Sequence, residues 1–148
     1  MRFFQEFTPV GKALYHAPTQ TLILGDTHIG QEAALQSEGV FVPRFSLDDL
    51  IADTKSYLQE VNPSRVIING DVKHNFGKIS RTEWQHTFKY ISFLEDSYDV
   101  LIIRGNHDVL VEPLVEKFDV EVLTSLDVGL ATVTHGHEIV ETDKEYTI

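Results

Sequence analysis

The sequence predicts an α/β fold with a largely parallel sheet at its centre. Short apolar segments alternate along the chain with longer segments of helical periodicity, which is typical of strand–helix–strand units. The chain has 148 residues, enough for one domain with a core of its own. It contains no internal repeat and no Ser/Gly-rich linker, so we expect residues 1–148 to form a single domain.

The first half of the chain predicts a hairpin, a helix and a strand. Residues 12–16 and 21–24 flank an Ala-Pro-Thr-Gln turn, which is typical of a β-hairpin. Apolar side chains recur at helical spacing over residues 46–60, and the Asn-Pro pair that follows ends the helix. Residues 65–68, Arg-Val-Ile-Ile, predict a short buried strand.

The second half continues the alternation of helices and strands. Residues 82–94 carry an apolar stripe and predict a second helix. Residues 100–103 predict another buried strand, and residues 111–118 a short helix with its proline in the first turn. Two further strands are predicted at residues 120–123 and 129–134.

The composition excludes several classes of protein. Lys plus Arg is 12 and Asp plus Glu is 23, which gives a net charge of -11 and opposes non-specific adhesion to nucleic acid or anionic membranes. There is no cysteine, so disulfides and thiolate metal sites are excluded. No segment has the pattern of a signal peptide or a membrane span, which favours a cytoplasmic protein.

Four apolar segments end in polar side chains of similar kinds. The endings read Gly-Asp-Thr-His at 25–28, Gly-Asp at 70–71 followed by His74, Gly-Asn-His-Asp at 105–108 and His-Gly-His at 135–137. Taken singly, each is more simply a turn or a helix cap. Ligands collect at the carboxyl ends of strands in an open α/β sheet, so we expect all four endings to meet at one edge.

These side chains are suited to binding metal ions. Carboxylate oxygen, amide oxygen and imidazole nitrogen, without sulfur, are ligands for Mn, Fe, Zn, Ni or Co, and we favour Mn. Two such ions roughly 3.5–4 Å apart, sharing a bridging carboxylate, polarise a phosphoryl oxygen and activate a water. The residues therefore predict two divalent ions and phosphoester hydrolysis.

The four motifs, in this order, resemble the calcineurin-like metallophosphoesterases. That family's signature reads Asp-x-His, Gly-Asp-x-x-Asp, Gly-Asn-His-Asp/Glu, His and a final Gly-His-x-His, and the resemblance extends from about Lys12 to the last residue. LGDTHIG and GDVKHNFG look most like small archaeal and bacterial phosphoesterases related to the nuclease subunit of double-strand-break repair complexes. The resemblance implies an αββα sandwich, in which helices flank two packed sheets.

The resemblance also implies a role for each matching position. Asp26 and His28 would bind one metal ion, Asp71 would bridge both ions, and Asn106 and His135 would bind the second.

Two residues of the third motif have roles nearer the substrate. His107 would stabilise the transition state or act as general acid toward the leaving oxygen, so His107 and Asp71 are the expected catalytic pair. Asp108 matches the acidic position of the motif and would more readily shape the loop than bind metal.

The sequence departs from the family signature in two places. His74 stands where a second aspartate is usual, and three roles stay open for it: replacing that aspartate, contacting substrate, or neither. No Gly-His-x-His follows His137, and residues 145–148 look like the start of the strand that would lead into it. We therefore hypothesise a C-terminally truncated chain that lacks the last strands of the sandwich, with His137 as a further candidate ligand.

The predicted function is metal-dependent hydrolysis of a phosphoester, with a phosphodiester or nucleotide favoured and nucleic acid left open as a partner. Lys73 and Arg104 are candidates for the rim of the site, where cations would meet phosphates, although a solvated loop is the simpler interpretation. A homodimer also stays open. The alternative is a non-catalytic phosphoesterase-like scaffold, or a protein-binding module with an incomplete metal site.

Overall fold

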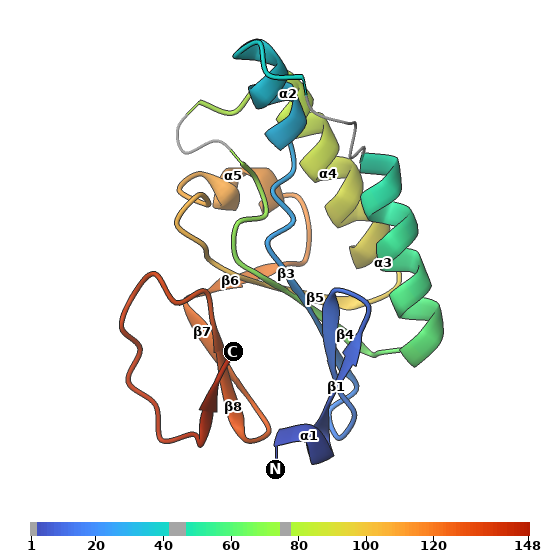
Figure 1. The fold of residues 1–148 in the computed structure, drawn as a ribbon, viewed down its shortest axis with the longest axis vertical. Coiled ribbons are helices and arrows are strands. Elements are labelled where there is room, and N and C mark those ends of the chain that lie inside the picture. The colour runs from blue at the N-terminus through green and yellow to red at the C-terminus, as the bar shows by residue number, and fades with distance from the viewer. Residues whose placement is uncertain (1–2, 42–46, 75–77) are drawn as a thin grey trace.

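The computed structural model describes residues 3–41, 47–74 and 78–148 (Figure 1). Along the chain the elements are α1 (Phe3–Glu6), β1 (Phe7–Val10), β2 (Ala13–His16), β3 (Thr21–Gly25), α2 (Gln31–Ser37), α3 (Leu47–Val61), β4 (Arg65–Asn69), α4 (Arg81–Glu95), β5 (Asp99–Ile103), α5 (Val111–Val115), β6 (Glu121–Leu123), β7 (Ser125–Val128), β8 (Ala131–Thr134) and β9 (Tyr146–Thr147).

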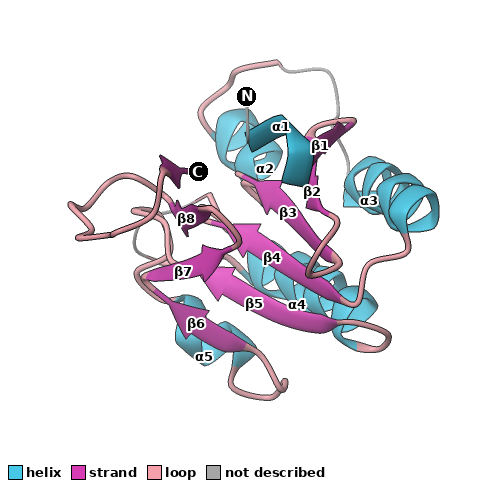
Figure 2. Cartoon of the chain, turned by 90° about the horizontal axis from the view of Figure 1, so that it is seen from below, coloured by secondary structure: helices cyan, strands magenta, loops and turns pink. Residues whose placement is uncertain are grey.

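In the described part of the chain, the main sheet has six strands in the order β1-β2-β3-β4-β5-β6 (Figure 2). β1, β2 and β3 are antiparallel neighbours, and β3 to β6 run parallel. The predicted hairpin and the predicted parallel sheet are therefore confirmed. The register pairs Gly25 with Asn69 and Asn69 with Ile103, so the carboxyl ends of β3, β4 and β5 lie level with one another.

Alternating residues of the central strands face two different cores. On β4, Val66 and Ile68 face the cluster that includes apolar residues of α3, α4 and α5, whereas Ile67 faces the second sheet. All three side chains are fully buried, as expected for a parallel strand covered on both faces. Figure 1 shows α3 and α4 along one face of the sheet, with β7 and β8 on the opposite side.

The second sheet is formed, among the residues that the structure describes, by three strands in the order β7-β8-β9, with β9 parallel to β8. Val128, Ala131 and Val133 pack against the main sheet in the second core. The described residues of α2 to α5 take no part in that core. In this part of the chain the layers are thus helix, sheet and sheet, and the second helical layer of the predicted αββα sandwich is not seen among the described residues.

Several element boundaries differ from the sequence-based expectation. The helix predicted at 46–60 is α3, and residue 46 lies outside the described residues. The helix predicted at 111–118 is only the five-residue α5. The strand predicted at 129–134 begins at Ala131, because Gly129 has a positive φ and forms the turn from β7. In the described part of the chain, no helix has the length and apolar character needed to span a membrane.

The strand that carries His135 was expected in the same sheet as the other three motif strands. This expectation was wrong, because β8 belongs to the second sheet. All four residues of β8 are buried. The strand pairs with β7 on one edge and with β9 on the other, so neither edge pairs with the main sheet. The predicted strand start near the C-terminus is confirmed as β9.

Candidate metal centre

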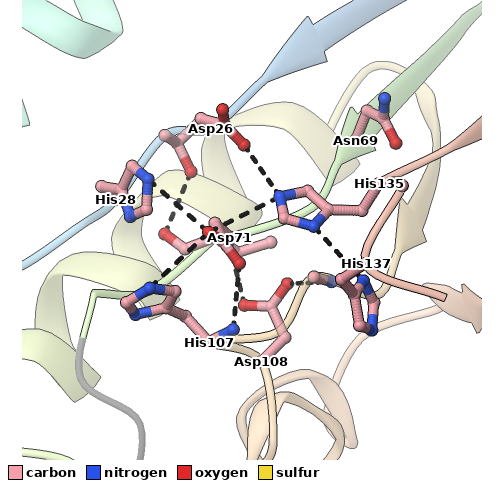
Figure 3. Close-up of polar contacts among 12 residues, drawn as sticks. Asp26, His28, Asn69, Asp71, His107, Asp108, His135 and His137 are labelled. Carbon is pink, nitrogen blue, oxygen red and sulfur yellow. Dashed lines mark hydrogen bonds and ion pairs between the residues drawn. The ribbon is translucent and has the colours of Figure 1, made fainter. Parts of the chain in front are cut away.

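The centre lies where the level ends of β3, β4 and β5 meet the end of β8 (Figure 3). The side chain of Asn69, the last residue of β4, donates a hydrogen bond to the carbonyl oxygen of Thr134 at 3.2 Å. This bond joins the two sheets one residue before His135. Asn69 was not among the predicted site residues, and its place directly before Gly70-Asp71 was the available signal.

Asp71 occupies the middle of the centre, and its carboxylate is buried. Its Oδ2 lies 3.6 Å from Nε2 of His28, 3.9 Å from Nε2 of His107 and 3.5 Å from Nε2 of His135. Its Oδ1 accepts the backbone N–H of His107 at 3.0 Å. One carboxylate therefore contacts residues from three different loops, which is the position that a bridging ligand requires.

The first two motifs are held in a strained backbone conformation. Asp26, His28 and Asp71 have φ angles of 34°, 42° and 45°, in the left-handed region that costs a non-glycine residue on the order of 1–3 kcal/mol. The His28 backbone N–H donates to the Asp71 carbonyl at 2.8 Å, and the Thr27 hydroxyl donates to the Val72 carbonyl at 3.0 Å. These bonds hold the two loops together and keep the ligand atoms of the three residues within 4.8 Å of one another.

His74 joins a second group of candidate ligands. Ligand atoms of His28, His74 and His107 lie within 4.8 Å of one another, and the ring centroids are 5.3 to 5.6 Å apart. Burial, together with the neighbouring imidazoles of His28 and His107, lowers the pKa of His74. The structure thus brings His74 into the centre, although the sequence left its role open.

The donor atoms gathered at this centre fit a metal ion, and two of its histidines also carry a ring nitrogen without a partner among the described residues. Nδ1 of His28 and Nδ1 of His74 are both buried and have no hydrogen-bond partner among the described residues. Unpaired buried polar atoms are rare in folded proteins and call for a partner. Neutral imidazole nitrogens beside carboxylates are a donor set for Mn, Fe, Zn, Ni or Co.

Lys73 lies neither at the rim of the site nor on a solvated loop, the two positions predicted for it from the sequence. It is fully buried, and its ammonium donates to the carbonyl oxygen of His107 at 2.6 Å. The cause is the β-bridge between Ile29 and Lys73, which places the residue beneath the first motif loop. Burial lowers the pKa of Lys73, and the charges of Glu83, Asp108 and Asp71 oppose that shift.

Asp108 is completely buried and holds the loop that carries His107. Its Oδ1 accepts the backbone N–H groups of Val72 at 2.9 Å and Lys73 at 3.4 Å, and its Oδ2 accepts that of Gly105 at 2.9 Å. Burial raises the pKa of Asp108, while the three backbone hydrogen bonds oppose the rise. The contacts fix the backbone on either side of the centre.

The remaining predicted residues lie at the edge of the centre or outside it. His135 Nε2 is 3.1 Å from Oδ1 of Asp26, and its Nδ1 is 3.3 Å from Nδ1 of His137, so the centre includes both histidines of the last motif. Asn106 is exposed and makes no side-chain hydrogen bond to the described residues of the centre. Arg104 is half exposed, and its guanidinium pairs with Glu112 of α5.

Two glycines allow this close packing. A Cβ atom on Gly70 would lie 1.9 Å from Cδ2 of His135, and one on Gly105 would lie 2.2 Å from Oδ1 of Asp71. Gly70 also has a φ of 78°, which glycine adopts without strain. Both positions therefore need a residue without a side chain if His135 and Asp71 are to keep their places.

Comparisons with known proteins indicate the family and the fold of the chain. The family model of the calcineurin-like phosphoesterases matches residues 19–147. A comparison with curated protein sequences gave no match. Among solved structures, the chain is similar to the Pseudomonas putida nuclease MPE, with a TM-score of 0.64 and 20% identity over 95% of this chain and 70% of that chain. At this identity the likeness shows a shared fold.

Proposed function

The chain belongs to the calcineurin-like phosphoesterase family, and we propose that it hydrolyses a phosphoester at a dinuclear metal centre built around Asp71. The observation that carries the proposal is the position of the Asp71 carboxylate, which lies within 4 Å of the rings of His28, His107 and His135. A carboxylate shared in this way is the feature that a two-metal site needs.

The residues divide into two sets of ligands that share Asp71. Asp26 and His28 would complete the first set, since their ligand atoms lie within 4.8 Å of Asp71. His135 would belong to the second set. Asn106 is proposed as a further ligand of that set only because it matches the family motif. His74 and His137 are additional nitrogen donors that contact the residues of the two sets. Two divalent ions, with Mn favoured, would supply a polarised phosphoryl oxygen and an activated water.

His107 is positioned to move a proton at Nε2. Its Nδ1 contacts the carbonyl oxygen of His74, which only accepts hydrogen bonds, so Nδ1 carries the ring proton. Nε2 then faces Asp71 and the centre. When protonated at Nε2, the ring donates to the leaving oxygen as a general acid. The backbone of His107 is fixed on both sides, by Asp71 at its N–H and by Lys73 at its carbonyl.

The charge of the chain and its structural neighbour both bear on the substrate class. We propose a phosphodiester or a nucleotide, and the solved neighbour described as a nuclease supports a phosphodiester. The net charge of -11 favours a small or locally bound substrate over an extended nucleic acid.

The test combines metal content with hydrolysis. We expect about two Mn ions per chain after loading, and Mn-dependent release of 4-nitrophenol from bis(4-nitrophenyl) phosphate. Asp71→Asn removes the bridging carboxylate and should abolish turnover, whereas Asp119→Asn makes the same chemical change at an exposed residue outside the centre and should not. A folded protein that binds no metal and hydrolyses no phosphoester would favour the non-catalytic scaffold instead.

A further inference from the structure

A hollow of about 160 Å³ opens beside Asp26, on the side of that residue that faces α3. Gly25 and Asp26 of the first motif line it together with Tyr57 and Thr54 of α3 and Tyr90 of α4. Lys12 also lines the hollow and forms an ion pair with Asp53 at 3.7 Å. The hollow is thus continuous with the proposed metal centre through Asp26, and its lining includes none of the histidines.

Neither the backbone conformation nor crowding by the described residues requires a glycine at position 25. Its φ is not positive, and a Cβ atom there would meet no described atom within 4 Å, its two chain neighbours apart. Among the eight glycines that the structure describes, Gly25 alone combines an ordinary φ with open space. The missing side chain leaves room directly beside Asp26 that a bound group can enter.

The walls of the hollow are rigid and partly aromatic. The hydroxyls of Thr54 and Tyr90 are hydrogen bonded at 2.9 Å in the interior. A Cβ atom on Gly11 would lie 2.2 Å from Cε1 of Tyr57, so the turn between β1 and β2 presses against the edge of that ring. Side chains that are already fixed lose little freedom when a ligand binds.

We propose that this hollow binds the second organic group of a phosphodiester substrate, and that the group carries a planar ring such as a nucleobase. The ring would pack against Tyr57 beside Gly25 while the phosphate reaches the centre past Asp26. Every nucleobase presents a π face to an aromatic side chain, so such a wall accepts bases without selecting one sequence. The inference rests on the proposed function, because it places the phosphate at the metal centre.

The test uses two diesters with the same leaving group and the same charge, bis(4-nitrophenyl) phosphate and methyl 4-nitrophenyl phosphate. Gly25→Val fills the hollow from β3, and Tyr57→Leu removes its aromatic wall from α3. We expect Tyr57→Leu to lower kcat/KM for the bis-aryl ester about tenfold, mainly through KM, and to leave the methyl ester and Mn binding near wild type. Gly25→Val stands next to Asp26, so for this variant we expect only that kcat/KM falls further for the bis-aryl ester than for the methyl ester. Each variant's kcat/KM is divided by the wild-type value for the same ester, which removes the difference in intrinsic reactivity between the two esters.

Equal losses on both diesters in both variants would overturn the inference and leave the proposed function intact. Tyr57→Leu is the variant further from Asp26. If its kcat/KM for the bis-aryl ester, divided by its kcat/KM for the methyl ester, equalled the wild-type value, the inference would be overturned as well. Failure of the wild-type protein to hydrolyse either diester with Mn would instead overturn the proposed function, and this inference with it.

Discussion

The carboxylate of Asp71 contacts both the backbone and the ring of His107. Its Oδ1 accepts the His107 N–H at 3.0 Å, and its Oδ2 lies 3.9 Å from Nε2 of the same residue. The proposed bridging ligand therefore also sets the position of the proposed general acid, so the metal set and the proton donor cannot shift independently.

Two substitutions of Asp71 separate these two effects. Asp71→Asn keeps an oxygen that can accept the His107 N–H, whereas Asp71→Ala leaves that N–H without its acceptor. Both variants should lose at least about 100-fold in Mn affinity and turnover. Asp71→Ala should in addition be less stable than Asp71→Asn by about 1 kcal/mol, because a polar group loses its hydrogen bond. Urea unfolding of the metal-free variants measures the difference, and equal stabilities would contradict the expected role of the bond.

Gly70→Ala tests the contact between the second motif and His135. The new Cβ would overlap Cδ2 of His135, and the φ of 78° adds strain on the order of 1–3 kcal/mol. We expect lower stability and loss of metal from the second ligand set. Gly39→Ala is the matched control, since Gly39 has a φ of 80° but open space around a Cβ. Elemental analysis should show normal metal content in the control, and an equal metal loss in both variants would contradict the contact.

Asp108→Asn tests how the catalytic loop is held. The carboxylate accepts three backbone N–H groups, two on Oδ1 and one on Oδ2. An amide has a single oxygen, so its NH₂ group must face one of these donors. We expect a loss of stability of about 1–3 kcal/mol, which is the cost of leaving a buried donor unpaired. Thermal unfolding alongside the exposed-site control Asp119→Asn gives the comparison, and a variant as stable as that control would exclude the role.

Much of the site followed from the strand endings. Buried parallel strands have apolar side chains on both faces, so β4 and β5 could be found as short apolar runs followed by glycine and polar residues. The three level strand ends then place the first three motifs together without any knowledge of side-chain packing.

The rest depended on contacts distant in sequence. Lys73 was indistinguishable from a surface lysine, because its burial comes from the bridge to Ile29, far earlier in the chain. The surroundings of His74 are set in the same way, by loops carrying His28 and His107. α2 gave no periodic signal, since none of its residues is buried. β1 is four residues long and contains a proline, so its alternation was too short to detect.

The lowered pKa of His74 predicts a pH dependence of stability in the metal-free protein. An unperturbed histidine has a pKa of about 6.5, and burial together with the imidazoles of His28 and His107 lowers the value in the folded state. The unfolded chain therefore binds a proton at His74 before the folded chain does. The stabilising contribution is complete above a pH of about 6.5 and is lost as the pH falls toward the lowered pKa.

His74→Asn removes this titration, so its stability should fall less than that of wild type as the pH is lowered from about 7.5 to about 5. His86→Asn is the control, because it removes a histidine on α4 that lies outside the clusters of candidate ligands. Urea unfolding in the presence of a chelator, at several pH values, gives the slope of stability against pH for each protein. If His74→Asn kept the wild-type slope of stability against pH, the protons taken up on unfolding would bind to groups other than His74. A residue that binds protons equally in the folded and unfolded states contributes nothing to that slope.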